Sequence, residues 1–180
     1  MIPVKILKIS YQPSTRNYYI ILKEIDGDQC IPLTIGSSEA QSIALALESV
    51  EATRPMTHDL ICKLISDIDF SLKRVRITDL KDGVFYSYID LESKKFGNQK
   101  IDARPSDAIA IALRENAPIL VSKKLIKDSG IDQQTFVENN DKEKFEKLLK
   151  KLKLKLNNAI RDEKYEIAAE LRDKIRKMGN

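Results

Sequence analysis

The chain has few of the residues and motifs that define metal centres and nucleotide-binding loops. Its 180 residues include one histidine and two cysteines, Cys30 and Cys62, which are too few and too far apart for a structural zinc site. It has no glycine-rich phosphate loop, no dinucleotide-binding fingerprint and no nucleophile elbow. These absences exclude the protein classes that such motifs define.

Long apolar runs and a secretory signal are also missing. No stretch approaches the roughly 20 apolar residues needed to span a bilayer, and the first residues lack the charged and apolar regions of a signal peptide. We therefore expect a cytoplasmic protein that does not contact membranes, with both cysteines reduced in its core. Hydrophobic residues make up 42% of the chain and charged residues 32%, which is typical of one folded domain with or without a small appendage.

Positive charge is concentrated near the C-terminus. Residues 1–138 contain 18 lysines and arginines against 19 acidic residues, whereas residues 139–180 contain 13 against 8. By composition the large region is therefore not a basic nucleic-acid clamp. Any nucleic acid that binds there must bind at a local patch.

The most informative pattern is a repeat at an offset of 68 residues. Residues 4–9 align with residues 72–77. At the same offset, matching residues within 38–45 align with residues within 106–113, without a gap. The two halves, about 4–68 and 72–128, each have the pattern of a β-hairpin, a strand and a helix. This predicts an α+β fold in which the duplicated units close into one mixed-sheet domain over residues 1–130. It also puts Glu39 and Asp107 at equivalent positions near a pseudo-two-fold axis.

Residues 142–180 follow a polar segment, 131–141, that we expect to be a linker. Apolar residues recur at spacings of three and four in two sets, from Leu149 to Ala159 and from Ala168 to Met178. The residues between the sets, 161–164, are all charged. This predicts an antiparallel helical hairpin with a narrow apolar seam.

The only histidine lies in the segment Arg54-Pro55-Met56-Thr57-His58-Asp59-Leu60, which we expect to open a helix. A histidine that is neutral near pH 7 can act as general base or acid, and Asp59 can orient it or hold a metal ion. The same residues also suit a structural role, because Thr57 can cap the helix and Asp59 complements its dipole. The sequence leaves both interpretations open.

A second polar cluster is Asp102-Ala103-Arg104-Pro105-Ser106-Asp107, at the start of another expected helix. Phosphate could bind at the helix N-terminus with Arg104, or Asp102 and Asp107 could hold Mg²⁺. In the structural alternative, Ser106 caps the helix and Arg104 pairs with a carboxylate. Arg104 stands where the first copy has Gly36, a change that a simple cap would not require.

At these residues the chain resembles the bifunctional nuclease domain family. The resemblance covers residues 1 to about 130 and depends on residues 35–40, 54–60 and 102–110. It implies a mixed α+β fold that dimerises, and nuclease activity, since plant members are reported to degrade both RNA and DNA. It supplies no catalytic set, so we infer one from the matching motifs. We assign His58, Asp59 and Asp107 as catalytic, Arg54, Arg104 and Ser106 as phosphate-binding, and Glu39, Asp59 and Asp107 as ligands of a divalent cation such as Mg²⁺.

Residues 147–178 are similar to the UVR motif, the short helical hairpin of nucleotide-excision repair proteins. In related proteins this motif is a protein–protein contact element, including in protease adaptors. The resemblance therefore implies a protein partner for the hairpin. The expected contact residues are Leu156, Ala159, Tyr165, Ala168, Leu171 and Arg172.

Two functions remain compatible with the sequence. The first is a nuclease that hydrolyses phosphodiester bonds of RNA or DNA and contacts a protein through the hairpin. The second is a non-catalytic dimeric adaptor or ligand-sensing scaffold that recruits a repair or proteolysis partner. The specific resemblance favours the nuclease, whereas the near-neutral main domain and the absence of a strong catalytic motif favour the adaptor.

Overall fold

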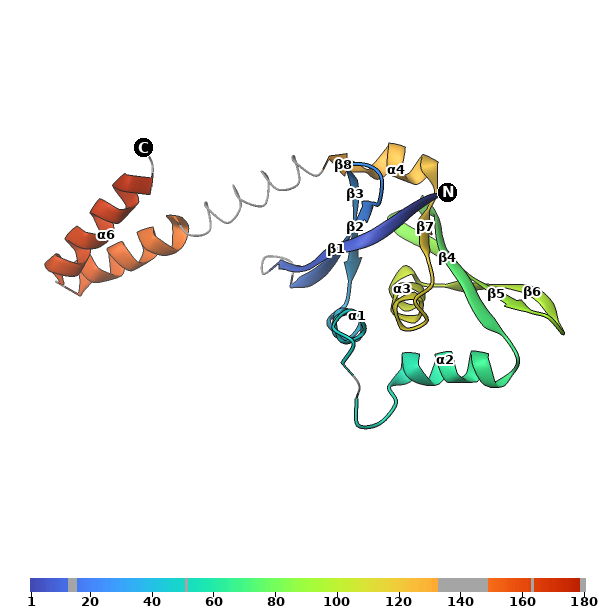
Figure 1. The fold of residues 1–180 in the computed structure, drawn as a ribbon. Coiled ribbons are helices and arrows are strands. Elements are labelled where there is room, and N and C mark those ends of the chain that lie inside the picture. The colour runs from blue at the N-terminus through green and yellow to red at the C-terminus, as the bar shows by residue number, and fades with distance from the viewer. Residues whose placement is uncertain (13–15, 51, 133–148, 163, 179–180) are drawn as a thin grey trace. The chain divides into compact units, whose positions relative to one another are not determined.

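The computed structural model describes residues 1–12, 16–50, 52–132, 149–162 and 164–178 (Figure 1). The chain divides into two compact units, Met1–Gln133 and Gln134–Asn180. The first unit is an α+β domain built around one mixed sheet of eight strands. Among the described residues, no helix is long and apolar enough to cross a bilayer.

The first copy of the repeat folds as three strands and two helices. These are β1 (Ile2–Gln12), β2 (Asn17–Glu24), β3 (Gln29–Ile35), α1 (Ser37–Leu47) and α2 (Thr57–Asp67). Helix α1 ends at Leu47, although the apolar residue Val50 follows at helical spacing. The helix ends there because Ser49 adopts the left-handed backbone conformation, with φ at 51°, which reverses the chain.

The second copy follows the same order and then continues. Its elements are β4 (Ser71–Lys81), β5 (Val84–Ser93), β6 (Gly97–Ala103), α3 (Pro105–Arg114), β7 (Ile119–Val121), α4 (Lys123–Ser129) and β8 (Ile131–Asp132). β8 pairs with β3, so the first two residues of the expected linker 131–141 belong to the sheet. The remainder of that segment lies outside the described residues.

The structure confirms the duplication at the predicted offset. β3 ends at Ile35 and β6 at Ala103, and α1 begins at Ser37 and α3 at Pro105, so both pairs are 68 residues apart. The sheet order is β6-β5-β4-β7-β1-β2-β3-β8. β7 is antiparallel to β1 and parallel to β4, so β1 and β4 run in opposite directions. A pseudo-two-fold axis near β7 therefore relates the two copies.

Helix α3 lies at the centre of the domain. It packs against α1 and α2 and against strands β4 and β5 (Figure 1). All residues from Ala108 to Ala112 are buried, and burying Ile109 or Ile111 stabilises the fold by about 2 kcal/mol each. Their alanine neighbours allow the other helices to approach closely. This packing holds the first turns of α1, α2 and α3 on one side of the domain.

Both cysteines lie where the sequence indicated, Cys30 in β3 and Cys62 in α2, and both are buried and unpaired. Burial raises the pKa of each thiol, and for Cys62, which also contacts Glu115, the pKa is raised to about 12. Neither thiol is therefore a reactive thiolate near neutral pH.

The described part of the second unit is helical. Residues 149–161 form one helix and α6 (Tyr165–Met178) forms the next, with a short break between them, as the hairpin prediction required. Leu152 and Ala159 are buried, in agreement with the predicted seam. Leu156 and Leu171 are half-buried and Arg172 is exposed, whereas the side chains of Tyr165 and Ala168 lie outside the described set.

Candidate functional site

The first turns of three helices meet at one cleft of about 630 Å³. Glu39 and Ser42 come from α1, His58 from α2, and Arg104 and Asp107 from the start of α3. The rest of the lining is largely apolar and includes Ile61, Ile65, Ile89, Ile101 and Ile111. Because water is partly excluded by this apolar lining, the polar contacts inside it are stronger than on an open surface.

His58 is held between residues of the two copies. Its Nδ1 lies 2.8 Å from Ser42 Oγ, and its Nε2 lies 3.3 Å from Asp107 Oδ1. A carboxylate only accepts hydrogen bonds, so Nε2 carries a hydrogen in this contact and, in the neutral ring, the Ser42 hydroxyl donates to Nδ1. The His58 side chain is 14% exposed and that of Asp107 28%, so both can be reached from the cleft.

Arg104 joins the equivalent acidic residues of the two copies. It donates from Nε to Asp107 Oδ2 at 2.8 Å and from Nη1 to Glu39 Oε1 at 3.2 Å. The Asp107 carboxylate raises the pKa of Arg104. The pKa of Glu39 is lowered by its own backbone N–H, by the Ser38 hydroxyl and by Arg104. The Arg104 side chain is 68% exposed, so its guanidinium is open to an anionic ligand.

The residue of the first copy that corresponds to Arg104 is a glycine, and this allows Arg104 to contact both Glu39 and Asp107. Gly36 is the N-cap residue of α1, as Arg104 is of α3. A Cβ atom at Gly36 would lie 2.3 Å from Glu39 Oε2. Any side chain there would displace the Glu39 carboxylate, so a single arginine from the second copy serves both acids.

Asp59 has a different environment from the other predicted catalytic residues. It does not line the cleft, and its carboxylate accepts from Arg114 Nε and from the backbone N–H of Met56. These two contacts, Arg114 first, lower the pKa of Asp59. The N-cap residue of α2 is Met56, so the expectation that Thr57 caps this helix is wrong. Asp59 takes over the capping by binding the Met56 N–H.

Arg114 connects this ion pair to the cleft. Its Nη1 donates to the backbone carbonyls of Ser42 at 3.3 Å and Ala110 at 2.9 Å. Ser42 and Ala110 are equivalent positions of the two copies, 68 residues apart. Arg114 therefore fixes the position of Ser42, whose hydroxyl orients His58.

The remaining predicted site residues, Asp102, Arg54 and Ser106, differ in their relation to the cleft. Asp102 lines it, whereas the exposed Arg54 and the buried Ser106 do not. Sequence reasoning missed Ser42 and Arg114. Comparison of the copies offered a signal for both, because Ser42 stands where the second copy has Ala110 and Arg114 where the first has Ala46.

The expected cation ligands do not form a common donor set in this geometry. Within the described ranges, no three histidine, cysteine, aspartate or glutamate side chains gather closely enough to hold a metal ion. The Arg104 guanidinium contacts both Glu39 and Asp107, and Arg114 holds Asp59. These three carboxylates therefore do not fit a divalent cation as they stand.

Comparison with known proteins decides the family. Residues 20–134 match the bifunctional nuclease domain, and residues 146–180 match the UvrB/UvrC motif. The chain belongs to the bifunctional nuclease domain family. Both resemblances seen in the sequence are thereby confirmed.

Relatives of this bifunctional nuclease domain chain occur in bacteria and plants. An uncharacterised protein of Mycobacterium tuberculosis is 38% identical, over 81% of this chain and 92% of its own length. Bifunctional nuclease 1 of Arabidopsis thaliana is 27% identical, over 87% of this chain and 54% of its own length. Bifunctional nuclease 1 of Oryza sativa subsp. japonica is 28% identical, over 66% of this chain and 37% of its own length. The chain thus spans about half or less of these plant relatives.

Proposed function

We propose that the chain is a cytoplasmic nuclease that hydrolyses phosphodiester bonds of RNA, DNA or both at the cleft between its two copies. The observation that carries the proposal is the arrangement of His58, Asp107 and Arg104, which places a proton donor, a proton acceptor and a phosphate-binding cation in one partly apolar cleft. The family and its relatives named bifunctional nuclease support the same activity.

Water is the proposed nucleophile. An enzyme that acts on both RNA and DNA cannot depend on the 2′-hydroxyl, because DNA lacks it. A phosphate group in the cleft would bind the exposed guanidinium of Arg104 and draw it from Asp107, leaving that carboxylate free to accept the proton of the attacking water. The protonated His58 donates its Nε2 proton to the leaving oxygen. Ser42 holds the ring in place through Nδ1.

The other predicted site residues have supporting parts in this proposal. Asp59 positions α2 through Arg114 and does not react itself. Arg54 and Ser106 remain predicted phosphate contacts. The divalent cation also remains a prediction, and no step above depends on it.

The first test is cleavage of labelled RNA and DNA oligonucleotides by the full-length chain, with and without EDTA. Replacing Arg104 by methionine should lower kcat/KM about 100-fold, because the cation that stabilises the phosphate charge is lost. Lys127→Met, an exposed lysine on α4, is the charge-matched control and should cleave as wild type does.

The outcomes of this assay distinguish a nuclease with or without a cation from a protein that only binds anions. Cleavage that persists in EDTA supports the mechanism without a cation. Cleavage that EDTA abolishes would mean that the reaction depends on a bound cation. Equal, faint cleavage by wild type and Arg104→Met would mean a contaminant and would reject the nuclease. Binding of an oligonucleotide or a phosphorylated small molecule without turnover would favour the alternative, a ligand-sensing adaptor whose cleft holds anions through Arg104.

The C-terminal helices are proposed to recruit a protein partner. Leu154, Ile160 and Ile167 are each at least half exposed, so the second unit presents apolar surface. Of the expected contact residues, Ala159 is buried and Leu156 and Leu171 are half-buried. A partner would therefore meet the exposed apolar residues together with Arg172.

A homodimer is proposed from the outer face of α2. Leu60, Leu64 and Ile68 recur every fourth residue there and are 52%, 53% and 56% exposed. A second copy would bury this stripe. Leu64→Glu should convert a dimer to a monomer in sedimentation equilibrium, since it places a charge in the middle of the stripe. Lys63→Glu, one residue away and outside the stripe, is the control. A wild-type chain that sediments as a monomer would contradict the proposal.

A further inference from the structure

The outer face of strands β4, β5 and β6 carries no part of the cleft chemistry described above. Side chains alternate along these paired strands, so Val75 and Ile89 lie on the core side. Ile101 pairs with Ile89 and lies on the same side, where it lines the cleft. The outer face is defined here by the residues of the opposite register, which are Arg74, Arg76, Tyr86, Tyr88, Asp90 and Lys100. In the first copy, Ile21 pairs with Lys8 as Tyr88 pairs with Arg76, and Ile21 is fully buried.

Positive charge on the outer face exceeds the acidic charge that it pairs with. Arg74 Nε donates to Asp90 Oδ2 at 2.8 Å, and Arg76 donates to both oxygens of the same carboxylate at 2.6 Å. Two guanidinium groups therefore share one negative charge. Lys100, on the edge strand β6, adds a further cation next to them, although the exposed Asp102 partly offsets it. Lys81 and Asp79, which pairs with Tyr86, add one charge of each sign, so the cations Arg74, Arg76, Lys81 and Lys100 outnumber the carboxylates Asp79, Asp90 and Asp102 by one.

Aromatic rings lie among these cations. Lys100 Nζ is 3.4 Å from the centre of the Tyr88 ring, and Arg76 Cζ is 6.0 Å from it. Lys81 Nζ is 5.4 Å from the centre of the Tyr86 ring, and Tyr86 is 39% exposed. Tyr86 and Tyr88 are two residues apart on one strand, so their side chains lie on the same face and their Cα atoms are about 7 Å apart. Aromatic rings interleaved with cations on a sheet stack unpaired bases and bind the phosphates between them.

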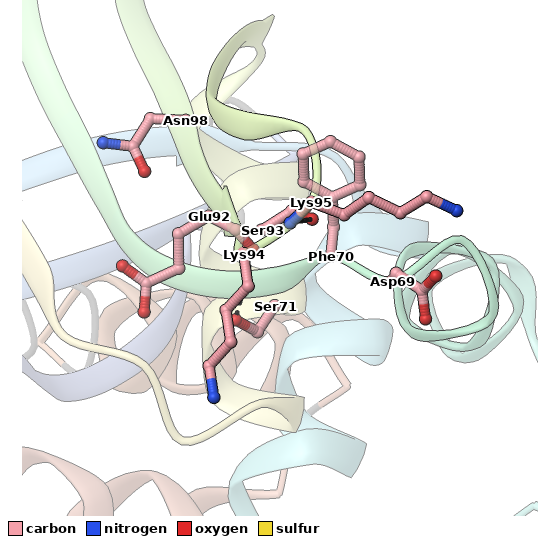
Figure 2. A pocket seen from close by; sticks show the side chains of 8 residues that line it. All are labelled: Asp69, Phe70, Ser71, Glu92, Ser93, Lys94, Lys95 and Asn98. Carbon is pink, nitrogen blue, oxygen red and sulfur yellow. Dashed lines mark hydrogen bonds between the residues drawn. The ribbon is translucent and has the colours of Figure 1, made fainter.

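The outer face continues into a hollow of about 550 Å³ at the turn between β5 and β6 (Figure 2). Glu92 and Asn98 are paired there, in the row beyond Asp90 and Lys100. Figure 2 shows Lys94 and Lys95 leaving the turn in different directions around this hollow. The two lysines extend the row of cations along the strands, and the acidic residues Asp69 and Glu92 of the same hollow balance their charge.

We propose that the outer face of β4, β5 and β6 binds single-stranded nucleic acid. Bases stack on Tyr86 and Tyr88, and Arg74, Lys81 and Lys100 bind the backbone. β6 is the edge of the sheet, and Ile101 and Ala103 line the cleft from its other side. A nucleic-acid strand bound to the outer face therefore has only to pass around β6 to reach Arg104. The idea that a substrate reaches the cleft along this face rests on the proposed nuclease activity. The binding of single-stranded nucleic acid to the face does not depend on that activity.

The test is fluorescence anisotropy with the full chain, using single-stranded oligothymidylate and oligouridylate of about twelve nucleotides and a duplex of the same length. Tyr86→Ala should weaken single-strand binding about tenfold through the lost stacking. Lys100→Gln should reduce the slope of log K against log salt by about 0.7, as expected for one lost phosphate contact on a single strand. The matched controls are Tyr11→Ala, another half-exposed tyrosine, and Lys127→Gln, and both should bind as wild type does.

The outcomes separate this inference from the proposed nuclease. Duplex binding as tight as single-strand binding, or wild-type binding by both Tyr86→Ala and Lys100→Gln, would overturn the inference even if the chain cleaves. Single-strand binding that these variants weaken would support it even if no cleavage is seen. If Tyr86→Ala does not fold, Lys81→Gln with Lys100→Gln decides, because both lysines are exposed. Together they should reduce the salt slope by about 1.4.

Discussion

Replacing His58 by glutamine is expected to lower the cleavage rate about 1,000-fold. Glutamine can keep a hydrogen bond in the cleft, but it cannot give a proton to the leaving oxygen. Asp107→Asn should cost a similar factor, because the amide cannot take the proton of water. The measurement is the single-turnover rate on a labelled oligonucleotide, compared with wild type across pH 5–9.

The pair offers a strict internal check. His58 Nε2 and Asp107 Oδ1 are in contact, so the two residues are expected to work as one unit. The double variant should then be little slower than either single variant, whereas independent residues would multiply their losses. Ser42→Ala keeps His58 and should cost less, about tenfold. Rates that His58→Gln leaves unchanged, in protein with a wild-type circular dichroism spectrum, would remove His58 from the reaction.

Replacing Arg114 by methionine should destabilise the first unit by about 2–3 kcal/mol. Methionine keeps much of the buried side-chain volume but loses the bonds to Asp59 and to the Ser42 and Ala110 carbonyls. The Arg114 side chain is only 12% exposed, so water cannot fully replace these contacts. Urea unfolding followed by circular dichroism measures the loss. Lys127→Met, on exposed surface, should change stability by less than about 0.5 kcal/mol.

The same variant should change the response to acid. The pKa of Asp59 is lowered in the folded chain, so this carboxylate stabilises the fold above its unfolded pKa of about 3.9. That contribution disappears as the pH falls through the lower folded value. The stability difference between wild type and Arg114→Met should therefore be largest near neutrality and shrink below about pH 4. A difference that stays constant down to pH 3 would mean that Arg114 acts through packing alone.

The sequence contained most of the fold because the duplication repeats its turns and helix starts at a fixed offset. The segments around His58 and Asp107 were therefore recognisable as helix openings, one in each copy, and their meeting was expected from closing the two copies. The place of β7 between β1 and β4 did not follow from the sequence, because nothing in its three residues indicates which strands it pairs with. Sheet order depends on long-range pairing, which local patterns do not encode.

The parts of the site that sequence reasoning missed depend on contacts made across the interface between the copies. Ser42 reads as an ordinary helix residue, and Arg114 reads as a cation that complements the end of its helix. Asp59 beside His58 suggested a dyad, yet neighbouring helix residues point in different directions, and Arg114 binds it instead. Only the tertiary structure shows that His58 contacts the carboxylate of Asp107 and not that of Asp59.

The narrow join between the copies determines what holds the cleft at its width. β7 pairs with only three residues of β1 and three of β4, and one of these, Pro3, has no backbone N–H to donate. So short a backbone seam resists rotation of one half against the other only weakly. The packing of α1 against α3 must supply the stiffness, and Ala40 of α1 and Ala108 of α3 are small residues buried in the core that these helices share. A larger side chain at either alanine would push the two halves apart and move Glu39 away from Arg104.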